Sequence, residues 1–192
     1  MTQIVLGSSS PFRKALLAKI LDAFDTFSPD IDESPLPDET PQQLVKRLSE
    51  AKARAVARHY PDALIIASDQ VSVLNGCING KPGNFDNALT QLQASSGNTV
   101  TFYTGLCLFH AGTQQMDSVI EPFQVHFRTL SDAAIRRYLE KETPYNCAGS
   151  FKSEGLGIAL FESMEGNDPN ALIGLPLIQL VRMLDRQGIT IP

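Results

Sequence analysis

The sequence has little of what would assign it to several large protein classes. Its 192 residues include three cysteines, Cys77, Cys107 and Cys147, which are far apart and form neither a CxxC pair nor a zinc-binding spacing. We therefore expect reduced thiols, the usual state in a cytoplasmic protein. No apolar run approaches the roughly 20 residues that a membrane-spanning helix needs. The first residues lack the basic and apolar regions of a signal peptide. The sequence thus predicts a cytoplasmic protein with no membrane partner.

Positive charge is also scarce. The chain has 16 Lys and Arg against 21 Asp and Glu, a formal net charge of −5. Affinity for a nucleic-acid backbone rests on clustered Lys and Arg, so we expect no nucleic-acid partner. A small basic pocket for a nucleotide remains compatible with this charge. The histidines, His59, His110 and His126, show no metal-ligand spacing, and no Ser or Cys has an identifiable base partner. Nucleophilic catalysis is therefore unsupported.

The composition is that of a globular protein, with 43% hydrophobic and 19% charged residues. The length predicts a single domain over residues 1–192, or two closely apposed lobes that share one core. The apolar patterns predict strands over residues 3–7, 24–28, 63–74, 77–80, 98–112, 115–130 and 155–166, and helices over 11–21, 40–60, 84–97, 131–142 and 175–187. A βα start followed by long strands favours an α/β fold with a mixed sheet.

The clearest predicted helix covers residues 40–60. Thr40 and Gln43 form the sequence pattern of a capping box, and Pro41 suits the first helical position. One apolar face is traced by four residues, Leu44, Leu48, Ala51 and Ala55. The preceding segment 29–39 is rich in proline and acidic residues, which is typical of a loop.

The stretch "VLGSSSPFRKALL" (5–17) has two interpretations. Three serines before Pro11 are good capping residues for a helix. The same hydroxyls, with the amide groups at the start of a helix and Arg13 one turn further on, would suit a phosphate group. This is not a GxxxxGK[ST] loop, so a phosphate site depends on other residues nearby.

Carboxylates and cations elsewhere supply the other candidate groups. Asp69 follows an apolar strand in "LIIASDQV", where it would either start a turn or act as a general base or a metal ligand. The loop "DIDES" contains Glu33, and Lys52 and Lys81 are isolated cations. Each of these residues alone is compatible with a solvated surface position. Together with the serine-rich stretch they indicate a phosphate site with carboxylates for a metal ion.

Seven short motifs occur in the order in which one family has them. They are "LGSSSPFRK", "DIDES", "LSEAKA", "ASDQV", "GKP", "SGNTVTFYTGLCL" and "CAGSFKSEGLG…GLPL". In these motifs, from Ile4 to about Leu184, the chain resembles the Maf-like nucleotide pyrophosphatases, and more narrowly their YceF-type 7-methyl-GTP pyrophosphatase subfamily. The resemblance implies a mixed, twisted sheet with flanking helices, in two lobes around a nucleotide cleft. It also implies metal-dependent hydrolysis of a nucleoside triphosphate to the monophosphate and pyrophosphate, and a homodimer.

The resemblance also implies roles for individual residues. Asp69 corresponds to the catalytic proton acceptor, and Asp69 and Glu33 to the acidic residues that hold a Mg²⁺ or Mn²⁺ ion. The residues that correspond to phosphate contacts are Ser8, Ser9, Arg13, Lys52 and Lys81. The residues that correspond to determinants of base specificity are Phe12, Gln70 and Glu154.

One position departs from the usual family pattern. Where the family often has Ser-Pro-Arg-Arg, this chain has an aromatic residue, Phe12, before Arg13. A 7-methylated guanine carries positive charge, which an aromatic face attracts by about 0.5–2 kcal/mol. Phe12 therefore favours 7-methyl-GTP as the substrate. The alternatives are a pyrophosphatase for dTTP, UTP or another modified nucleotide, and a non-catalytic nucleotide-binding regulator of cell division.

Overall fold

The computed structural model describes residues 2–192 and divides them into two compact units. The first unit contains residues 2–69, Thr104–Glu121 and Asp168–Pro192, and the second contains Gln70–Tyr103 and Pro122–Asn167. Two units agree with the two lobes that the resemblance implies, whereas a single domain over 1–192 stays a prediction. Among the described helices, none combines the length and the apolarity that crossing a bilayer requires.

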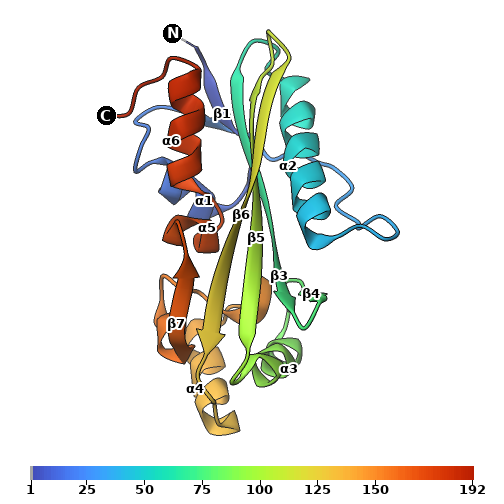
Figure 1. Cartoon of the computed structure of the whole chain (residues 1–192), viewed down its shortest axis with the longest axis vertical. Coiled ribbons are helices and arrows are strands. Elements are labelled where there is room, and N and C mark those ends of the chain that lie inside the picture. Colours follow the sequence, from blue (N-terminus) through green and yellow to red (C-terminus); the bar gives the residue numbers. More distant parts are fainter. Residues whose placement is uncertain (1) are drawn as a thin grey trace. The chain divides into compact units, whose positions relative to one another are not determined.

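The fold is α/β, with one mixed seven-stranded sheet (Figure 1). The strands are β1 (Ile4–Leu6), β2 (Asp25–Thr26), β3 (Leu64–Leu74), β4 (Cys77–Asn79), β5 (Thr99–His110), β6 (Gln115–Phe127) and β7 (Phe161–Gly166). Their order is β2-β1-β3-β5-β6-β7, and β4 pairs with β3. β1 is parallel to β2 and β3, whereas β4 and β7 are antiparallel to their partners. The predicted mixed sheet is therefore confirmed.

The helices begin and end largely where their capping residues predict. The α-helices are α1 (Pro11–Leu17), α2 (Pro41–Ala57), α3 (Phe85–Ser95), α4 (Asp132–Glu142), α5 (Pro169–Ile173) and α6 (Leu177–Arg186), and the 3₁₀ helices are η1 (Ala148–Ser150) and η2 (Leu156–Leu160). The capping box of α2 is present, with Gln43 N–H donating to Thr40 Oγ1 and Thr40 N–H to Gln43 Oε1. The turn Asn75-Gly76 has positive φ at both residues, as a tight hairpin between β3 and β4 requires.

In the first unit, alternating residues of each strand enter two separate cores. Leu6 and Ile66 pack with α1 and α6 on one face of the sheet, and Val5 and Ile65 pack with α2 on the other. The period of two along a strand sends neighbouring side chains to opposite faces, and helices cover both faces. At Gly105 in β5 the backbone of α2 comes so close that a Cβ would lie 2.3 Å from the carbonyl oxygen of Val45.

The buried face of α2 differs from the predicted one. Leu44 and Leu48 are buried as expected, but Ala51 and Ala55 are only half-buried. The remaining buried residues are Val45, Ser49, Lys52, Ala53 and Val56. A serine and a lysine lie on this face, so the hydrophobic pattern predicts only part of the buried side of the helix.

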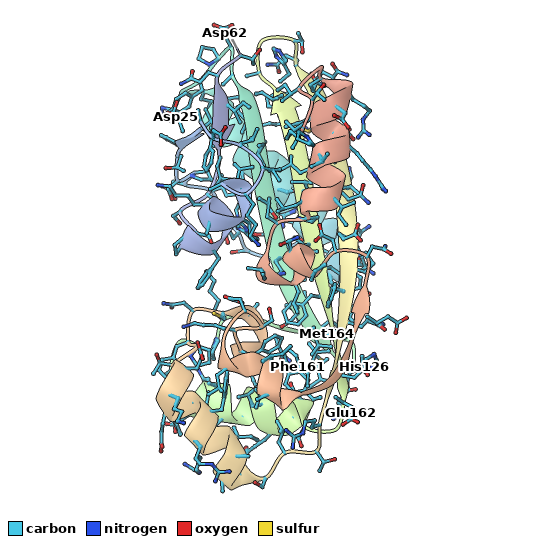
Figure 2. The ribbon with its side chains drawn as sticks, turned by 90° about the vertical axis from the view of Figure 1, so that its left-hand side faces the viewer. Asp25, Asp62, His126, Phe161, Glu162 and Met164 are labelled. Carbon is cyan, nitrogen blue, oxygen red and sulfur yellow. The ribbon has the colours of Figure 1, made fainter. Side chains whose placement is uncertain are left out.

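The second unit has an aromatic core. Phe102, Phe127, Phe151 and Phe161 contact one another edge to face, with ring centroids 4.9–5.5 Å apart. Phe161 begins β7 and is buried, whereas Glu162–Gly166 are exposed along the edge of the sheet, where Figure 2 labels Glu162 and Met164. α3 and α4 pack against each other in this unit.

Three predicted elements need correction. Residues 156–160, expected to begin a strand, form η2 because the amides of Gly155 and Gly157 both bond the Lys152 carbonyl and turn the chain. The first helix ends at Leu17 rather than at residue 21, since the amides of Lys19 and Ile20 bond carbonyls three residues back and tighten the last turn. The short helix α5 is absent from the prediction, because five residues are too few for a visible period.

Candidate functional site

The serine-rich segment between β1 and α1 caps a helix, as one of the two interpretations of the sequence predicts. Ser10 is the N-cap, and its Oγ accepts from Arg13 N–H at 3.4 Å. Ser8 Oγ accepts from Ser10 N–H at 3.1 Å, and Ser9 is exposed. Within residues 2–192, the amides of Ser9 and Phe12 donate to no acceptor. The segment is therefore a helix cap, and a phosphate site at its free amides and serine hydroxyls stays a prediction.

Arg13 is fixed by the backbone of a distant segment of the same unit. Its Nε donates to the Gly174 carbonyl oxygen at 2.8 Å, and the buried Ser68 Oγ donates to the same oxygen at 2.9 Å. Gly174 has φ 130°, a conformation that other residues rarely adopt. The fold thus orients the guanidinium through Nε, and its Nη groups have no hydrogen-bond partner among the described residues.

Burial and two nearby carboxylates act in opposite directions on the pKa of Arg13. Burial lowers its pKa from the ordinary value, and the nearby carboxylates of Asp69 and Glu33 oppose this change.

Lys52 joins two carboxylates at one point. Its Nζ lies 2.6 Å from Asp69 Oδ1 and 3.0 Å from Glu33 Oε1. The side chains of Lys52 and Asp69 are 9% and 10% exposed, whereas that of Glu33 is 57% exposed. The pair Lys52–Asp69 is therefore part of the interior, and Glu33 approaches it from the loop between β2 and α2.

The position of Asp69 corrects one expectation. The sequence offers two placements of Asp69, directly after an apolar strand or inside a strand that runs to residue 74. The structure has the second, because β3 continues to Leu74. The residues after Asp69 keep the alternation of a strand up to Leu74, as the predicted strand does. Asp69 is held by its strand neighbours on both sides rather than by a turn.

The remaining predicted site residues belong to the second unit. Gln70 is half-buried on β3, and Lys81 is exposed after β4. Glu154 is exposed just before η2 and accepts from Ser153 Oγ at 3.4 Å. Within the first unit, the structure gathers Arg13, Lys52, Asp69 and Glu33, and it places Ser8, Ser9 and Phe12 on the segment that carries Arg13. The contribution of the residues of the second unit to the same site stays a prediction.

Comparison with known proteins supplies the family. The model of the Maf-like protein family matches residues 3–187. The chain belongs to the Maf-like family. Proteins of this family are in general nucleoside triphosphate pyrophosphatases that depend on a divalent metal ion. Among solved structures, protein VC0702 from Vibrio cholerae is similar at 11% identity, over 74% of this chain and 72% of that chain, with a TM-score of 0.33. That distant similarity does not bear on the function.

The residues of this Maf-like protein fit a divalent ion that shares its coordination with a substrate. No group of three or more His, Cys, Asp or Glu within residues 2–192 is arranged to hold an ion unaided. Asp69 and Glu33, however, both reach the ammonium group of Lys52, so two carboxylates already converge on one positive charge. Mg²⁺ is commonly held by one or two carboxylates together with substrate phosphates and water. The oxygen donors suit Mg²⁺ or Mn²⁺.

Three residues of this Maf-like protein take part in the site without having been predicted. Ser68 and Gly174 hold Arg13, and Arg47 holds the loop that carries Glu33. Gly174 lies in the motif "GLPL", and Arg47 lies one turn and a half before Lys52 on the same helix. Ser68 and Gly174 are visible in the sequence only as parts of family motifs, because their contacts join segments that are distant in the chain. Arg47 lies outside the quoted motifs.

Proposed function

We propose that this protein hydrolyses nucleoside triphosphates between the α- and β-phosphates, releasing pyrophosphate, and that 7-methyl-GTP is its preferred substrate. The observation that carries the reaction is the Lys52 ammonium group held between Asp69 and Glu33, in the same unit as Arg13. Cations for the phosphates and a carboxylate for water are the groups that this reaction needs. The proposal includes a cytoplasmic location and a homodimer.

Each residue has a separate task in the proposed reaction. Ser8 and Ser9, with the amide groups beside them, bind phosphate oxygens, and the Nη groups of Arg13 stabilise the negative charge of the departing pyrophosphate. Asp69 accepts the proton of the attacking water, and Lys52 fixes the direction of its carboxylate at 2.6 Å. A divalent ion bound with Asp69 and Glu33 would reduce the repulsion between the triphosphate and the incoming oxygen.

The choice of base rests on Phe12. Phe12 is half-buried on the first turn of α1, directly before Arg13, so a nucleotide whose phosphates reach Arg13 has an aromatic ring close to it. The positive charge of 7-methylguanine favours such a ring over that of an uncharged base. Gln70 and Glu154 are proposed to contact the base, and Lys81 the phosphates. These three contacts rest on the family motifs alone.

The test is a panel of triphosphates with the purified protein. The panel contains 7-methyl-GTP, GTP, dTTP and UTP, with and without Mg²⁺, and pyrophosphate release is measured together with the nucleotide product. The proposal predicts Mg²⁺-dependent release of pyrophosphate and 7-methyl-GMP, fastest with 7-methyl-GTP. Faster turnover of dTTP or UTP would replace the proposed base preference. Binding of nucleotides without turnover of any of them would favour a non-catalytic regulator.

A further inference from the structure

Glu33 reaches the site from a loop that has no regular structure. The loop covers residues 29–39, between β2 and α2, and Glu33 is more than half exposed there. Its side chain contacts the site through an ion pair with Lys52 at 3.0 Å. An exposed ion pair contributes about 0–1 kcal/mol, which is too little to hold a loop against its conformational entropy. Another interaction must keep Glu33 beside Lys52.

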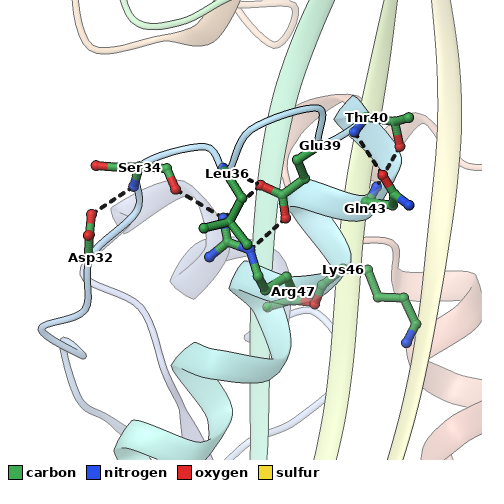
Figure 3. Close-up of polar contacts among 9 residues, drawn as sticks. Asp32, Ser34, Leu36, Glu39, Thr40, Gln43, Lys46 and Arg47 are labelled. Carbon is green, nitrogen blue, oxygen red and sulfur yellow. Dashed lines mark hydrogen bonds and ion pairs between the residues drawn. The ribbon is translucent and has the colours of Figure 1, made fainter.

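Arg47 on α2 supplies that interaction. Its Nε and Nη2 donate to Glu39 Oε1 and Oε2 at 2.6 and 2.8 Å, and Nη2 also donates to the carbonyl oxygen of Ser34 at 3.0 Å (Figure 3). Both ends of the segment 34–39 are thus held by one guanidinium group. A bidentate pair between arginine and a carboxylate is stronger and more directional than a single ion pair.

Hydrogen bonds within the loop extend this anchor to Glu33. Leu36 N–H donates to Glu39 Oε2 at 3.0 Å, and Glu39 N–H donates to the Leu36 carbonyl at 3.2 Å. Ser34 N–H donates to Asp32 Oδ1 at 2.9 Å. The Glu39 side chain is only 7% exposed. Glu33 therefore lies between Asp32 and Ser34, which are hydrogen-bonded to each other. The Ser34 carbonyl in turn accepts a hydrogen bond from Arg47.

One helix carries both the anchor of the loop and the partner of Glu33. Arg47 and Lys52 both lie on α2, five residues and therefore about 7.5 Å apart along its axis. The loop is tied to α2 at Arg47, and the side chain of Glu33 reaches the same helix again at Lys52. A rigid helix thus sets the distance between the anchored segment and the ammonium group.

We propose that Arg47, through Glu39 and the Ser34 carbonyl, is a positioning residue that holds Glu33 at Lys52 and Asp69. This inference rests on the proposed function, because it assigns Arg47 to the site of triphosphate hydrolysis. Arg47 does not touch the reacting groups. It acts on them through the loop. The loop is therefore part of the site, and its conformation is set from α2.

The first test measures the loop without any substrate or metal. Hydrogen–deuterium exchange of the full chain is compared for wild type, Arg47→Ala, Arg47→Lys and Arg58→Ala. Arg58 is an exposed arginine at the end of α2 and serves as the matched control. We expect exchange in peptides covering residues 30–40 to rise about tenfold in Arg47→Ala. The rise should be smaller in Arg47→Lys, which keeps the positive charge but loses the bidentate hydrogen bonds. Exchange within α2 should stay unchanged.

The second test asks whether Arg47 acts through Glu33. kcat and KM for the best triphosphate are measured for wild type, Arg47→Ala, Glu33→Gln and the double variant. A misplaced group near the reaction costs up to about 100-fold in rate, so we expect Arg47→Ala to lower kcat/KM by about 10- to 100-fold. In the Glu33→Gln background the same substitution should change kcat/KM by less than about twofold, because coupled residues are not additive. Arg58→Ala should match wild type.

Three results would overturn the proposal. The first is hydrogen–deuterium exchange in the loop that does not change in either Arg47 variant. The second is exchange that rises equally in the loop and in α2. The third is a loss of kcat/KM on Arg47→Ala that is as large in the Glu33→Gln background as in wild type. If the wild type hydrolyses no triphosphate, the proposed function fails. The exchange experiment then still decides whether Arg47 fixes the loop.

Discussion

Replacing Lys52 by methionine tests the arrangement at the centre of the site. Methionine is close to lysine in size, so the substitution removes the ammonium group with little change in packing. Asp69, whose side chain is 10% exposed, then keeps its negative charge without the partner that lies 2.6 Å away. Breaking a buried ion pair by removing one partner costs about 3–5 kcal/mol, whereas loss of the exposed contact with Glu33 adds at most about 1 kcal/mol. We expect the free energy of unfolding to fall by about 3 kcal/mol.

The assay is urea unfolding at pH 7 without nucleotide or metal, with a second variant that isolates the cause. Lys52→Met combined with Asp69→Asn leaves no unpaired charge, so its stability should return to within about 1 kcal/mol of wild type. Lys46→Met removes a half-exposed lysine of the same helix, paired with Glu50, and should cost no more than about 0.5 kcal/mol. The reasoning is refuted if Lys52→Met costs as little as Lys46→Met, or if the double variant is less stable than Lys52→Met.

Further predictions concern the base, the arginine and the loop. Phe12→Ala should raise KM for 7-methyl-GTP more than KM for GTP in steady-state assays, and equal increases would contradict stacking on the charged base. Ser68→Ala removes one of the two donors to the Gly174 carbonyl that orients Arg13. We expect kcat/KM to fall about tenfold and the free energy of unfolding to fall by about 1 kcal/mol. Unchanged kinetics would show that Arg13 needs no such support. Hydrogen bonds from Arg47 lower the pKa of Glu39 from 4.5 to about 2. The pair therefore stabilises the folded state fully above pH 4.5 and loses this contribution as the pH falls toward 2. The difference in unfolding free energy between wild type and Glu39→Gln should shrink over that range. A difference that grows would contradict this prediction.

Local signals in the sequence predict much of the fold. The capping box of Thr40 and Gln43 and the turn at Asn75-Gly76 are determined by residues within three positions of each other, and the structure has both. The start of α1 is equally local, since Ser10 caps a helix that begins at Pro11. Short-range hydrogen bonds and backbone preferences act in the same way in any fold.

The site is less accessible to such reasoning, because its contacts are long-range. Lys52 is buried only because Asp69, 17 residues away, supplies a carboxylate, and no helical period reveals that a lysine will face inward. Ser68 bonds a carbonyl 106 residues away. Family motifs predicted that Asp69, Lys52 and Glu33 act together, and the structure brings these three side chains to one point. Arg47 is not predicted, because a single arginine on a helix carries no signal of its own.

The measurement that most directly tests the central claim compares wild type with Asp69→Asn under identical conditions. 7-Methyl-GTP and Mg²⁺ are supplied, pyrophosphate release is measured, and affinity for a non-hydrolysable triphosphate is determined in parallel. The account predicts that wild type releases pyrophosphate and 7-methyl-GMP, and that Asp69→Asn stays folded, binds the analogue and loses at least about 100-fold in kcat. Turnover by Asp69→Asn close to that of wild type would contradict the assignment of Asp69 as the group that accepts the proton of water.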